Sequence, residues 1–244
     1  MNIGRGVLRG LLTCVAALMV SGVTLLAPAL LPSGPAAVAS AQTAGCADVQ
    51  VVFARGTGEP VGVGLVGDAF VNDLRSMVPG KSVAVYAVNY PASYDFLRAA
   101  EGANDASAFV QNTVATCPDT KIVLGGFSQG AAVIDAIAIA DHPQLGFTNP
   151  MPAAVTDHVA AVAVFGNPSI KLLGGPLTAL SPGYGYKTID LCNGADPVCS
   201  SGDDRPAHSL YVEAGLTTQA AQFVAGRLST EAPISTLASQ TTPN

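Results

Sequence analysis

The chain has 244 residues, of which 49% are hydrophobic and 11% are charged, so it holds enough apolar material for one α/β domain or two small ones. With 11 Lys and Arg against 17 Asp and Glu, the formal net charge is −6 at pH 7. This balance argues against a nucleic-acid-binding protein, because such proteins need cationic patches for phosphates, and the scarcity of charge suits apolar substrates.

The first 41 residues have the pattern of an export signal. Two arginines precede an uncharged, mostly apolar run at residues 11–31, and small residues then end in Ala39-Ser40-Ala41. An apolar run of about 20 residues is also long enough for a retained membrane anchor. Two prolines and the small-residue end favour a signal peptide over residues 1–41, cleaved after Ala41. We therefore expect a secreted protein that is either released or held at the cell envelope.

Short β-rich runs alternate with Ala-rich helical runs from residue 49 onward, an order typical of βαβ units around a mostly parallel sheet. The predicted strands are Val49–Ala54, Ser82–Val88, Lys121–Gly125, His158–Phe165 and Tyr186–Leu191. The predicted helices are Gly64–Val78, Ala99–Thr116, Gln129–Asp141 and Leu216–Leu228. The predicted loops are residues 167–185, residues 192–207 and a disordered tail at residues 229–244. One α/β domain over residues 42–228 accounts for all of these elements.

Cysteine usage supports export. Cys14 lies in the predicted signal, which leaves Cys46, Cys117, Cys192 and Cys199, an even number suited to two disulfides in an oxidising compartment. Three pairings are possible, and the two cysteines nearest in sequence, Cys192 and Cys199, form the simplest pair. We expect no metal site, because no C-x-x-C or H-x-x-x-H spacing occurs in the chain.

Residues 126–130 read GFSQG and match the G-x-S-x-G pattern of a nucleophile elbow. A strand-like run precedes the match and a strongly helical run follows it, so the order is strand, tight turn and helix. In an α/β hydrolase this turn lifts a serine hydroxyl above the sheet, and the flanking glycines avoid collisions with the neighbouring strand and helix. We interpret Ser128 as a nucleophile. The alternative is an ordinary serine in a glycine-rich turn.

A serine nucleophile needs a base, and the chain has three histidines. His142 follows the helix after Ser128 and lies about 20 Å away at 1.5 Å per residue. His158 opens a predicted strand, so it lies at the amino edge of a parallel sheet, whereas such sites form at the carboxyl edge. His208 follows the last predicted strand in a long loop that can fold back over the sheet. Elimination leaves His208 as the base.

The acid is expected between Ser128 and His208, because α/β hydrolases carry the triad in the chain order Ser, Asp, His. The aspartates in this interval are Asp135, Asp141, Asp157, Asp190, Asp196, Asp203 and Asp204. The first three lie on or near the helix after the serine or at the amino edge, and the last two are interpreted as solvated loop charges. Asp196 is preferred because a disulfide between its flanking cysteines would hold its loop rigidly. Asp190 lies within a predicted strand, and a role as a buried hydrogen-bonding side chain explains it equally well.

A tetrahedral intermediate needs two or more N–H donors for its oxygen. The backbone N–H of Gln129, directly after the serine, is one donor by the geometry of an elbow. The loop at residues 53–59, FARGTGE, is the expected source of another, since Thr57 offers both its N–H and its hydroxyl there. A plain turn between strand and helix explains that loop equally well.

Five segments carry a resemblance to a known family: residues 52–57 (VFARGT), 85–92 (VYAVNYPA), 125–130 (GGFSQG), 192–199 (CNGADPVC) and 207–208 (AH). Together they resemble the cutinase family of serine esterases, in particular the cutinase-like esterases of mycobacteria and related actinobacteria. The resemblance covers about residues 46–228. It implies a three-layer α/β hydrolase with a central five-stranded parallel sheet, no large lid and a shallow, partly exposed site.

The resemblance also implies roles for individual residues. They are the nucleophile Ser128, the base His208, the acid Asp196 and the oxyanion-hole residues Thr57 and Gln129, with the disulfides Cys46–Cys117 and Cys192–Cys199. Threonine stands at position 57 where fungal cutinases have serine, so activity on cutin itself is not implied.

The expected reaction is hydrolysis of a carboxylic ester of short to medium acyl chain through an acyl-enzyme. The apolar residues expected near the mouth of the site are Tyr90, Tyr94, Phe96, Leu172 and Leu173, with Ala207 and Leu210 beside the base. Each of them singly is also explained by packing.

The same machinery suits a phospholipase or thioesterase, and a lipid-binding surface antigen with a weak site is the alternative outside enzymes. The expected partners are a small-molecule or lipid ester and, transiently, a lipid surface; we expect a monomer without a cofactor.

Overall fold

The computed structural model describes residues 45–140, 143 and 146–230. The predicted signal peptide at residues 1–41 and residues 231–244 of the predicted tail lie outside the described residues. Asp141 and His142, which were weighed as site residues, also lie outside them.

Five parallel strands form one sheet. They are β1 (Val49–Ala54), β2 (Val83–Ala87), β3 (Lys121–Phe127), β4 (Val159–Phe165) and β5 (Thr188–Leu191). Their order across the sheet is β2-β1-β3-β4-β5, with every neighbouring pair parallel. The chain crosses from β1 to one side and then back to the other, so the carboxyl ends of β1 and β3 form a switch point. Ligand sites in α/β sheets form at such points.

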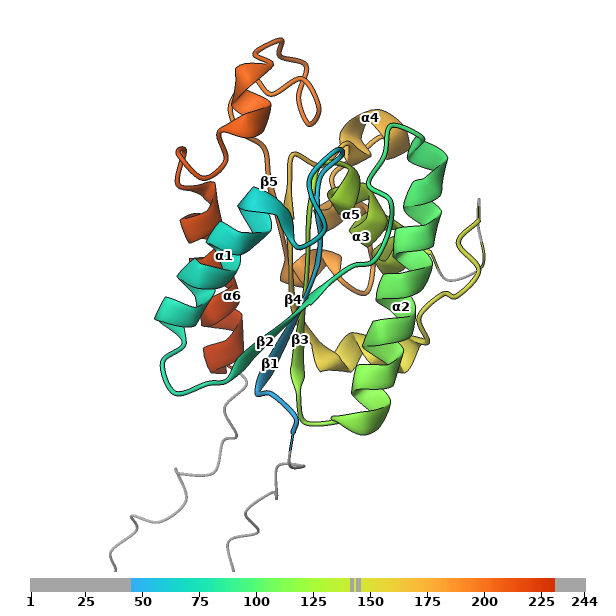
Figure 1. The fold of residues 1–244 in the computed structure, drawn as a ribbon, viewed down its shortest axis with the longest axis vertical. Coiled ribbons are helices and arrows are strands. Elements are labelled where there is room, and N and C mark those ends of the chain that lie inside the picture. The colour runs from blue at the N-terminus through green and yellow to red at the C-terminus, as the bar shows by residue number, and fades with distance from the viewer. Residues whose placement is uncertain (1–44, 141–142, 144–145, 231–244) are drawn as a thin grey trace, which may run out of the picture. The chain divides into compact units, whose positions relative to one another are not determined.

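Helices cover both faces of the sheet (Figure 1). On one face lie α1 (Gly64–Met77) and α6 (Leu216–Thr230), and on the other lie α2 (Ala99–Thr116), α3 (Gln129–Ile139) and the short α5 (Leu177–Leu180). A further short helix, α4 (Ser169–Leu173), follows β4 beyond the carboxyl ends of the strands. This arrangement confirms the predicted α/β fold with a central five-stranded parallel sheet.

The two apolar cores follow from alternation along the strands. In β1, Val51 and Phe53 belong to the core beneath α1 and α6, whereas Val52 and Ala54 belong to the core beneath α2 and α3. Successive side chains of a strand point to opposite faces, so a strand covered on both faces must be apolar throughout. The interior strand β4, between β3 and β5, is accordingly buried at all of its positions.

Most predicted boundaries lie within two residues of the observed ones. The strand β3 continues to Phe127 because Gly126 and Phe127 still pair with β4. Helix α3 ends at Ile139, since the backbone of Ala140 is extended. Helix α6 continues to Thr230, so the expected start of the tail at Ser229 is wrong.

The expectation of one continuous loop at residues 167–185 is also wrong, because α4 and α5 lie within it. Helices of four or five residues show no sequence periodicity. Tertiary contacts place α5 instead: the side chain of Leu177 is buried, and its N–H donates to Asp190 Oδ2 at 3.0 Å.

Two disulfides tie the fold together. Cys46–Cys117 links the segment before β1 to the end of α2, and Cys192–Cys199 closes a short ring after β5. This is the pairing that the family resemblance implies. Among the described residues, no helix is both long enough and apolar enough to cross a membrane.

Candidate active site

Ser128 stands at the apex of the turn between β3 and α3. Its backbone has φ 55° and ψ −118°, a conformation that costs a non-glycine residue on the order of 1–3 kcal/mol. The turn is this tight because its flanks are glycines. A Cβ on Gly126 would collide with the carbonyl oxygen of Gly130, and a Cβ on Gly130 would collide with that of Ala54. The geometry is that of a nucleophile elbow at the switch point of the sheet.

His208 reaches Ser128 from the segment after β5. Its Nε2 lies 2.9 Å from Ser128 Oγ. The ring of Phe127 stacks on the imidazole with centroids 5.0 Å apart. Gly166 also packs closely against the histidine, since a Cβ there would lie 3.0 Å from His208 Cε1 and from the Tyr211 hydroxyl. The imidazole is therefore confined by packing as well as by its hydrogen bonds.

Asp196 holds the opposite nitrogen of the imidazole. Its fully buried carboxylate has Oδ2 2.7 Å from His208 Nδ1, and it accepts hydrogen bonds from the Tyr211 hydroxyl (2.6 Å) and the Val198 N–H (2.8 Å). Burial raises the pKa of this carboxyl, but the three hydrogen bonds outweigh burial and hold the pKa below its ordinary value. Asp196 is thus ionised at neutral pH. The hydrogen of the neutral imidazole then lies on Nδ1, which leaves Nε2 as the acceptor facing Ser128.

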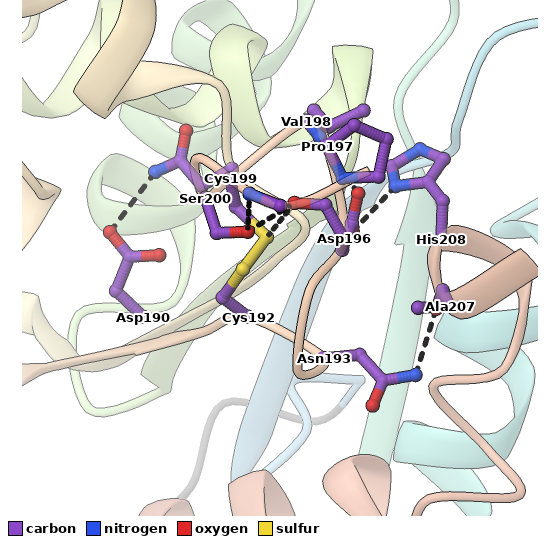
Figure 2. The surroundings of a disulfide bond; sticks show 12 residues. Asp190, Cys192, Asn193, Asp196, Pro197, Val198, Cys199, Ser200, Ala207 and His208 are labelled. Carbon is purple, nitrogen blue, oxygen red and sulfur yellow. Dashed lines mark hydrogen bonds and ion pairs between the residues drawn. A yellow bond between two sulfur atoms is a disulfide. The ribbon is translucent and has the colours of Figure 1, made fainter. Parts of the chain in front are cut away.

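The Cys192–Cys199 disulfide closes the loop that carries Asp196 (Figure 2). Within the ring the Asp196 N–H donates to the Asn193 carbonyl at 3.1 Å. The side-chain amide of Asn193 donates to the Ala207 carbonyl at 2.8 Å, which joins the ring to the residue before His208. The ring and the histidine are therefore held as one unit.

Within the described part of the chain, Cys192, Asp196 and Cys199 bring three potential metal-binding atoms close together: two sulfurs and one carboxylate oxygen. Both sulfurs belong to one disulfide, so neither is a thiolate ligand. The Asp196 oxygens already accept hydrogen bonds. The chemistry of this group therefore does not suit a metal ion.

Asp190, the alternative acid, lies across the disulfide from His208 in the view of Figure 2. Its Oδ2 accepts hydrogen bonds from the Leu177 N–H (3.0 Å) and from the Asn167 amide (3.3 Å), and the same amide nitrogen donates to Asp135 Oδ1 at 3.0 Å. Burial raises the pKa of both carboxyls, that of Asp135 to about 7, against the opposing effect of these hydrogen bonds. The two carboxyls form a buried cluster that braces α5 and the start of α4.

Thr57 and Gln129 meet beside the elbow. The Thr57 hydroxyl donates to Gln129 Oε1 at 3.2 Å, and Gln129 Nε2 donates to the Ser93 carbonyl at 3.0 Å. Gln129 is the first residue of α3, and the first N–H groups of a helix have no acceptor within it and attract negative charge. Thr57, Gln129, Ser128 and His208 all line one cavity of about 750 Å³.

The loop that carries Thr57 is held by Glu59. One oxygen of the Glu59 carboxylate accepts from the Gly56 N–H at 2.6 Å, and the other accepts from the Leu65 N–H at 2.9 Å. The Arg55 side chain donates through Nε to the Glu59 carbonyl at 3.0 Å. These bonds tie the loop to the start of α1, and sequence analysis assigned no part to Glu59.

Three of the residues expected at the mouth line the cavity: Tyr94, Phe96 and Leu172. Leu173 lines a neighbouring cavity instead. The expectation for Tyr90 is wrong, because its side chain is buried and its hydroxyl donates to the Arg55 carbonyl.

Several other candidates lie away from the cavity lining. Ala207 is buried and Leu210 is exposed, and neither lines the cavity. His158 ends the turn before β4, at the amino edge, with Nδ1 3.1 Å from the Pro118 carbonyl. Asp157 precedes it in the same turn, and Asp203 and Asp204 are exposed.

Tyr211 and Gly166 were missed by sequence analysis. Tyr211 is fully buried and donates to the carboxylate of Asp196. A lone tyrosine in a segment without periodicity carries no sequence signal of burial. Gly166 follows a buried strand and has φ 56°. In the sequence, a glycine directly after a predicted strand indicates only a turn.

The chain matches a protein-family model named Cutinase over residues 45–228. Phospholipase Culp4 of Mycobacterium tuberculosis is 54% identical over 223 residues, which cover 91% of this chain and 94% of that protein. Carboxylesterase Culp1 of the same organism is 50% identical over 213 residues, which cover 85% of this chain and 94% of that protein.

Solved structures of this fold are similar as well. Trichoderma reesei cutinase in complex with a C11Y4 phosphonate inhibitor has a TM-score of 0.61 and 32% identity, over 75% of this chain and 77% of that one. The catalytic core domain of acetyl xylan esterase from Trichoderma reesei has a TM-score of 0.64 and 27% identity, over 75% of this chain and 99% of that one. The chain therefore belongs to the cutinase family of carboxylic ester hydrolases.

Proposed function

We propose that the chain is a secreted serine carboxylesterase that hydrolyses fatty acyl esters of short to medium chain through an acyl-enzyme. The observation that carries this proposal is the continuous line from Ser128 Oγ to His208 (2.9 Å) and from His208 to the buried Asp196 (2.7 Å). This line lies beside a cavity large enough for a small ester and its acyl chain.

In the first half of the proposed reaction, Ser128 Oγ attacks the ester carbonyl carbon while His208 Nε2 takes its proton. The charge of Asp196 stabilises the imidazolium that forms. The imidazolium then gives the proton to the leaving alcohol oxygen as the C–O bond breaks, which leaves an acyl group on Ser128. In the second half, His208 takes a proton from water, the hydroxide attacks the acyl-enzyme, and the acid leaves as Ser128 regains its proton.

We assign Thr57 and Gln129 to the oxygen of the tetrahedral intermediate. The Gln129 N–H belongs to the start of α3, where partial positive charge favours an anionic oxygen. The Thr57 hydroxyl must exchange its 3.2 Å bond to the Gln129 side chain for one to the substrate. A donor of this kind contributes about 10²–10³ to kcat.

The decisive experiment compares the mature chain with Ser128→Ala on chromogenic butyrate and octanoate esters. We expect the substitution to lower kcat about 10⁴-fold or more, because no other group among the described residues is placed beside His208 to form the acyl-enzyme. Ser76→Ala, at an exposed serine on α1, is the matched control with unchanged kcat. Full activity of Ser128→Ala would contradict the proposal, and an inactive wild type would favour the lipid-binding surface antigen.

A phospholipase is the second candidate, because the relative that is 54% identical bears that name. The chemistry at Ser128 is the same, and only the substrate differs. Phosphatidylcholine vesicles, an acyl thioester and the octanoate ester are compared by kcat/KM on one preparation. A higher kcat/KM for the phospholipid or the thioester would replace the carboxylesterase assignment.

We also propose that residues 1–41 are removed on export and that the mature domain is a monomer. The two disulfides support an oxidising compartment. Mass spectrometry of the protein recovered from the culture medium is expected to give Gln42 as the first residue, and light scattering is expected to give the mass of one chain. A membrane-bound protein that still begins at Met1 would instead support a retained anchor.

A further inference from the structure

A second cavity lies next to the reaction cavity. Its volume is about 260 Å³, and it shares four lining residues with the reaction cavity: Phe96, Ala99, Ala132 and Leu172. The two cavities therefore adjoin, and neither the proposed reaction nor the residue assignments above use the second one.

The floor of the second cavity is α3, the helix that begins directly after Ser128. Ala132, Ala136 and Ile139 line it at helical spacings of four and three residues, so they share one face. At 1.5 Å per residue, Ala132 lies about 6 Å and Ile139 about 16 Å along the helix from Ser128. This space, which we call the α3 groove, leads away from the reacting serine.

The rims of the α3 groove are two pairs of large apolar side chains. Phe96 and Leu97 come from the turn before α2, and Leu172 and Leu173 come from the end of α4. Their exposed fractions are 61%, 80%, 70% and 51%. Apolar surface gains about 25 cal/mol for each Å² removed from water, and clustered exposed apolar side chains mark binding sites. A hydrocarbon chain between the rims would bury surface that is otherwise wet.

The groove has little to offer a polar ligand. Asp135 is the one ionisable residue among its described lining residues, and it is 3% exposed with Oδ1 bonded to the Asn167 amide. All the other described lining residues are apolar. The groove thus recognises length and apolar surface rather than charge.

We propose that the α3 groove binds the distal part of a long fatty acyl chain whose carbonyl carbon lies at Ser128. The proposal rests on the proposed function, because attachment to Ser128 is what directs the chain along α3, and it extends the expected substrates from medium chains to long ones. A butyryl chain ends inside the reaction cavity. A dodecanoyl chain continues past Ala132 and contacts both rims.

The test measures kcat/KM for dissolved chromogenic butyrate and dodecanoate esters, below the concentrations at which they form micelles. The wild type is expected to prefer the dodecanoate. Ala136→Leu places a larger side chain on the groove floor and is expected to lower the dodecanoate-to-butyrate ratio tenfold or more. Ala108→Leu, at an exposed alanine of α2 outside both cavities, keeps the wild-type ratio. A wild type that prefers butyrate, or an unchanged ratio in Ala136→Leu, overturns the proposal.

The rims are tested by Leu97→Ser with Leu173→Ser, which are exposed positions where a polar side chain does not threaten folding. The double variant is expected to lower the same ratio about tenfold. The control is Val61→Ser, which removes an exposed apolar side chain outside both cavities. A loss confined to emulsified esters, with an unchanged ratio on dissolved ones, would assign the rims to contact with a lipid surface and would overturn the acyl-chain site.

Binding of dodecanoate ion to Ser128→Ala protein, followed by calorimetry, separates the groove from the chemistry. Ala136→Leu in that background is expected to weaken binding tenfold or more. Equal binding by both proteins overturns the groove proposal even where Ser128 proves to be the nucleophile. Tight, groove-dependent binding with full hydrolysis by Ser128→Ala would instead retain the groove and reject the proposed function.

Discussion

Two groups of aspartates lie near the Cys192–Cys199 ring, and their pKa values shift in opposite directions although burial raises the pKa in both groups. Asp196 accepts hydrogen bonds from a hydroxyl, an imidazole and a backbone N–H, and its pKa lies below the ordinary value although burial pushes it upward. Asp135 and Asp190 share the amide of Asn167, Asp190 also accepts from the Leu177 N–H, and burial raises the pKa of both.

The two groups differ in their supply of donors: the side chain of Asp196 accepts three hydrogen bonds, that of Asp190 accepts two and that of Asp135 accepts one. A carboxylate that stabilises an imidazolium must stay charged, so it needs enough donors to offset the loss of water. A carboxyl that braces a helix holds its bonds in either protonation state. Donor count therefore separates the proposed triad acid from the structural acids.

The largest effect is expected from comparing the same substitution in the two groups. Asp196→Asn places a neutral amide opposite His208 Nδ1 and favours the wrong tautomer, so kcat on the butyrate ester is expected to fall about 10⁴-fold. Asp190→Asn is expected to stay within about threefold of wild type, because Asp190 makes no contact with the imidazole. The reverse order of these kcat values would transfer the role of acid to Asp190.

Removal of each disulfide separates rigidity at Asp196 from general stability. In the chain-entropy model the Cys46–Cys117 bond stabilises by about 4.4 kcal/mol and the Cys192–Cys199 bond by about 2.4 kcal/mol. The double serine variant of the first pair is therefore expected to show the larger fall in Tm. The double serine variant of the ring is expected to show the larger fall in kcat, up to about 10²-fold, since a displaced acid misplaces the base. Unchanged kcat without the ring would show that Tyr211 and Val198 suffice to hold Asp196.

A smaller effect is expected from Tyr211→Phe, which removes one of the three donors to Asp196. The loss of a hydrogen bond to a charged group is expected to cost about 1.5–3 kcal/mol and to lower kcat about tenfold.

A carboxyl with a lowered folded-state pKa stabilises the protein above its unfolded pKa, and this stability is lost as pH falls through the folded pKa. Because Tyr211→Phe raises the folded-state pKa of Asp196, we expect acidification to lower the Tm of the variant at a higher pH than it lowers the Tm of the wild type. Tyr86→Phe, which removes a hydroxyl bonded to Asp105, is the matched control. An acid transition of Tm that does not move would contradict the donor argument.

The last prediction concerns stability alone. Burial raises the folded-state pKa of Asp135 to about 7 from its ordinary value of 3.8, so the folded protein holds a proton that the unfolded chain releases. Stability is therefore expected to decrease as pH rises from about 4 to about 7 and to level off above that. Urea unfolding of Asp135→Asn between pH 5 and pH 8 is expected to show a smaller decrease than wild type. Parallel curves for the two proteins would refute the raised pKa.

Much of this arrangement could be predicted because it depends on local sequence. The alternation of strands and helices, the glycines of the GFSQG turn and the separation of His158 from the carboxyl edge all follow from periodicity and chain order. Short elements could not be predicted. Helix α5 exists because Leu177 is buried and its N–H meets Asp190, and neither fact is visible in four residues of sequence.

The sequence by itself determined the fold class, the position of the elbow and a short choice of bases and acids, because these depend on patterns within single segments. Only the tertiary structure decided what surrounds each acid, because the donors to Asp196 come from a ring, a loop histidine and the distant Tyr211. The α3 groove likewise exists only in three dimensions: its floor follows Ser128 in the chain, but its rims come from residues 96–97 and 172–173. A hydrogen bond or an apolar wall between distant segments leaves no periodic trace in either segment, so packing alone brings it about.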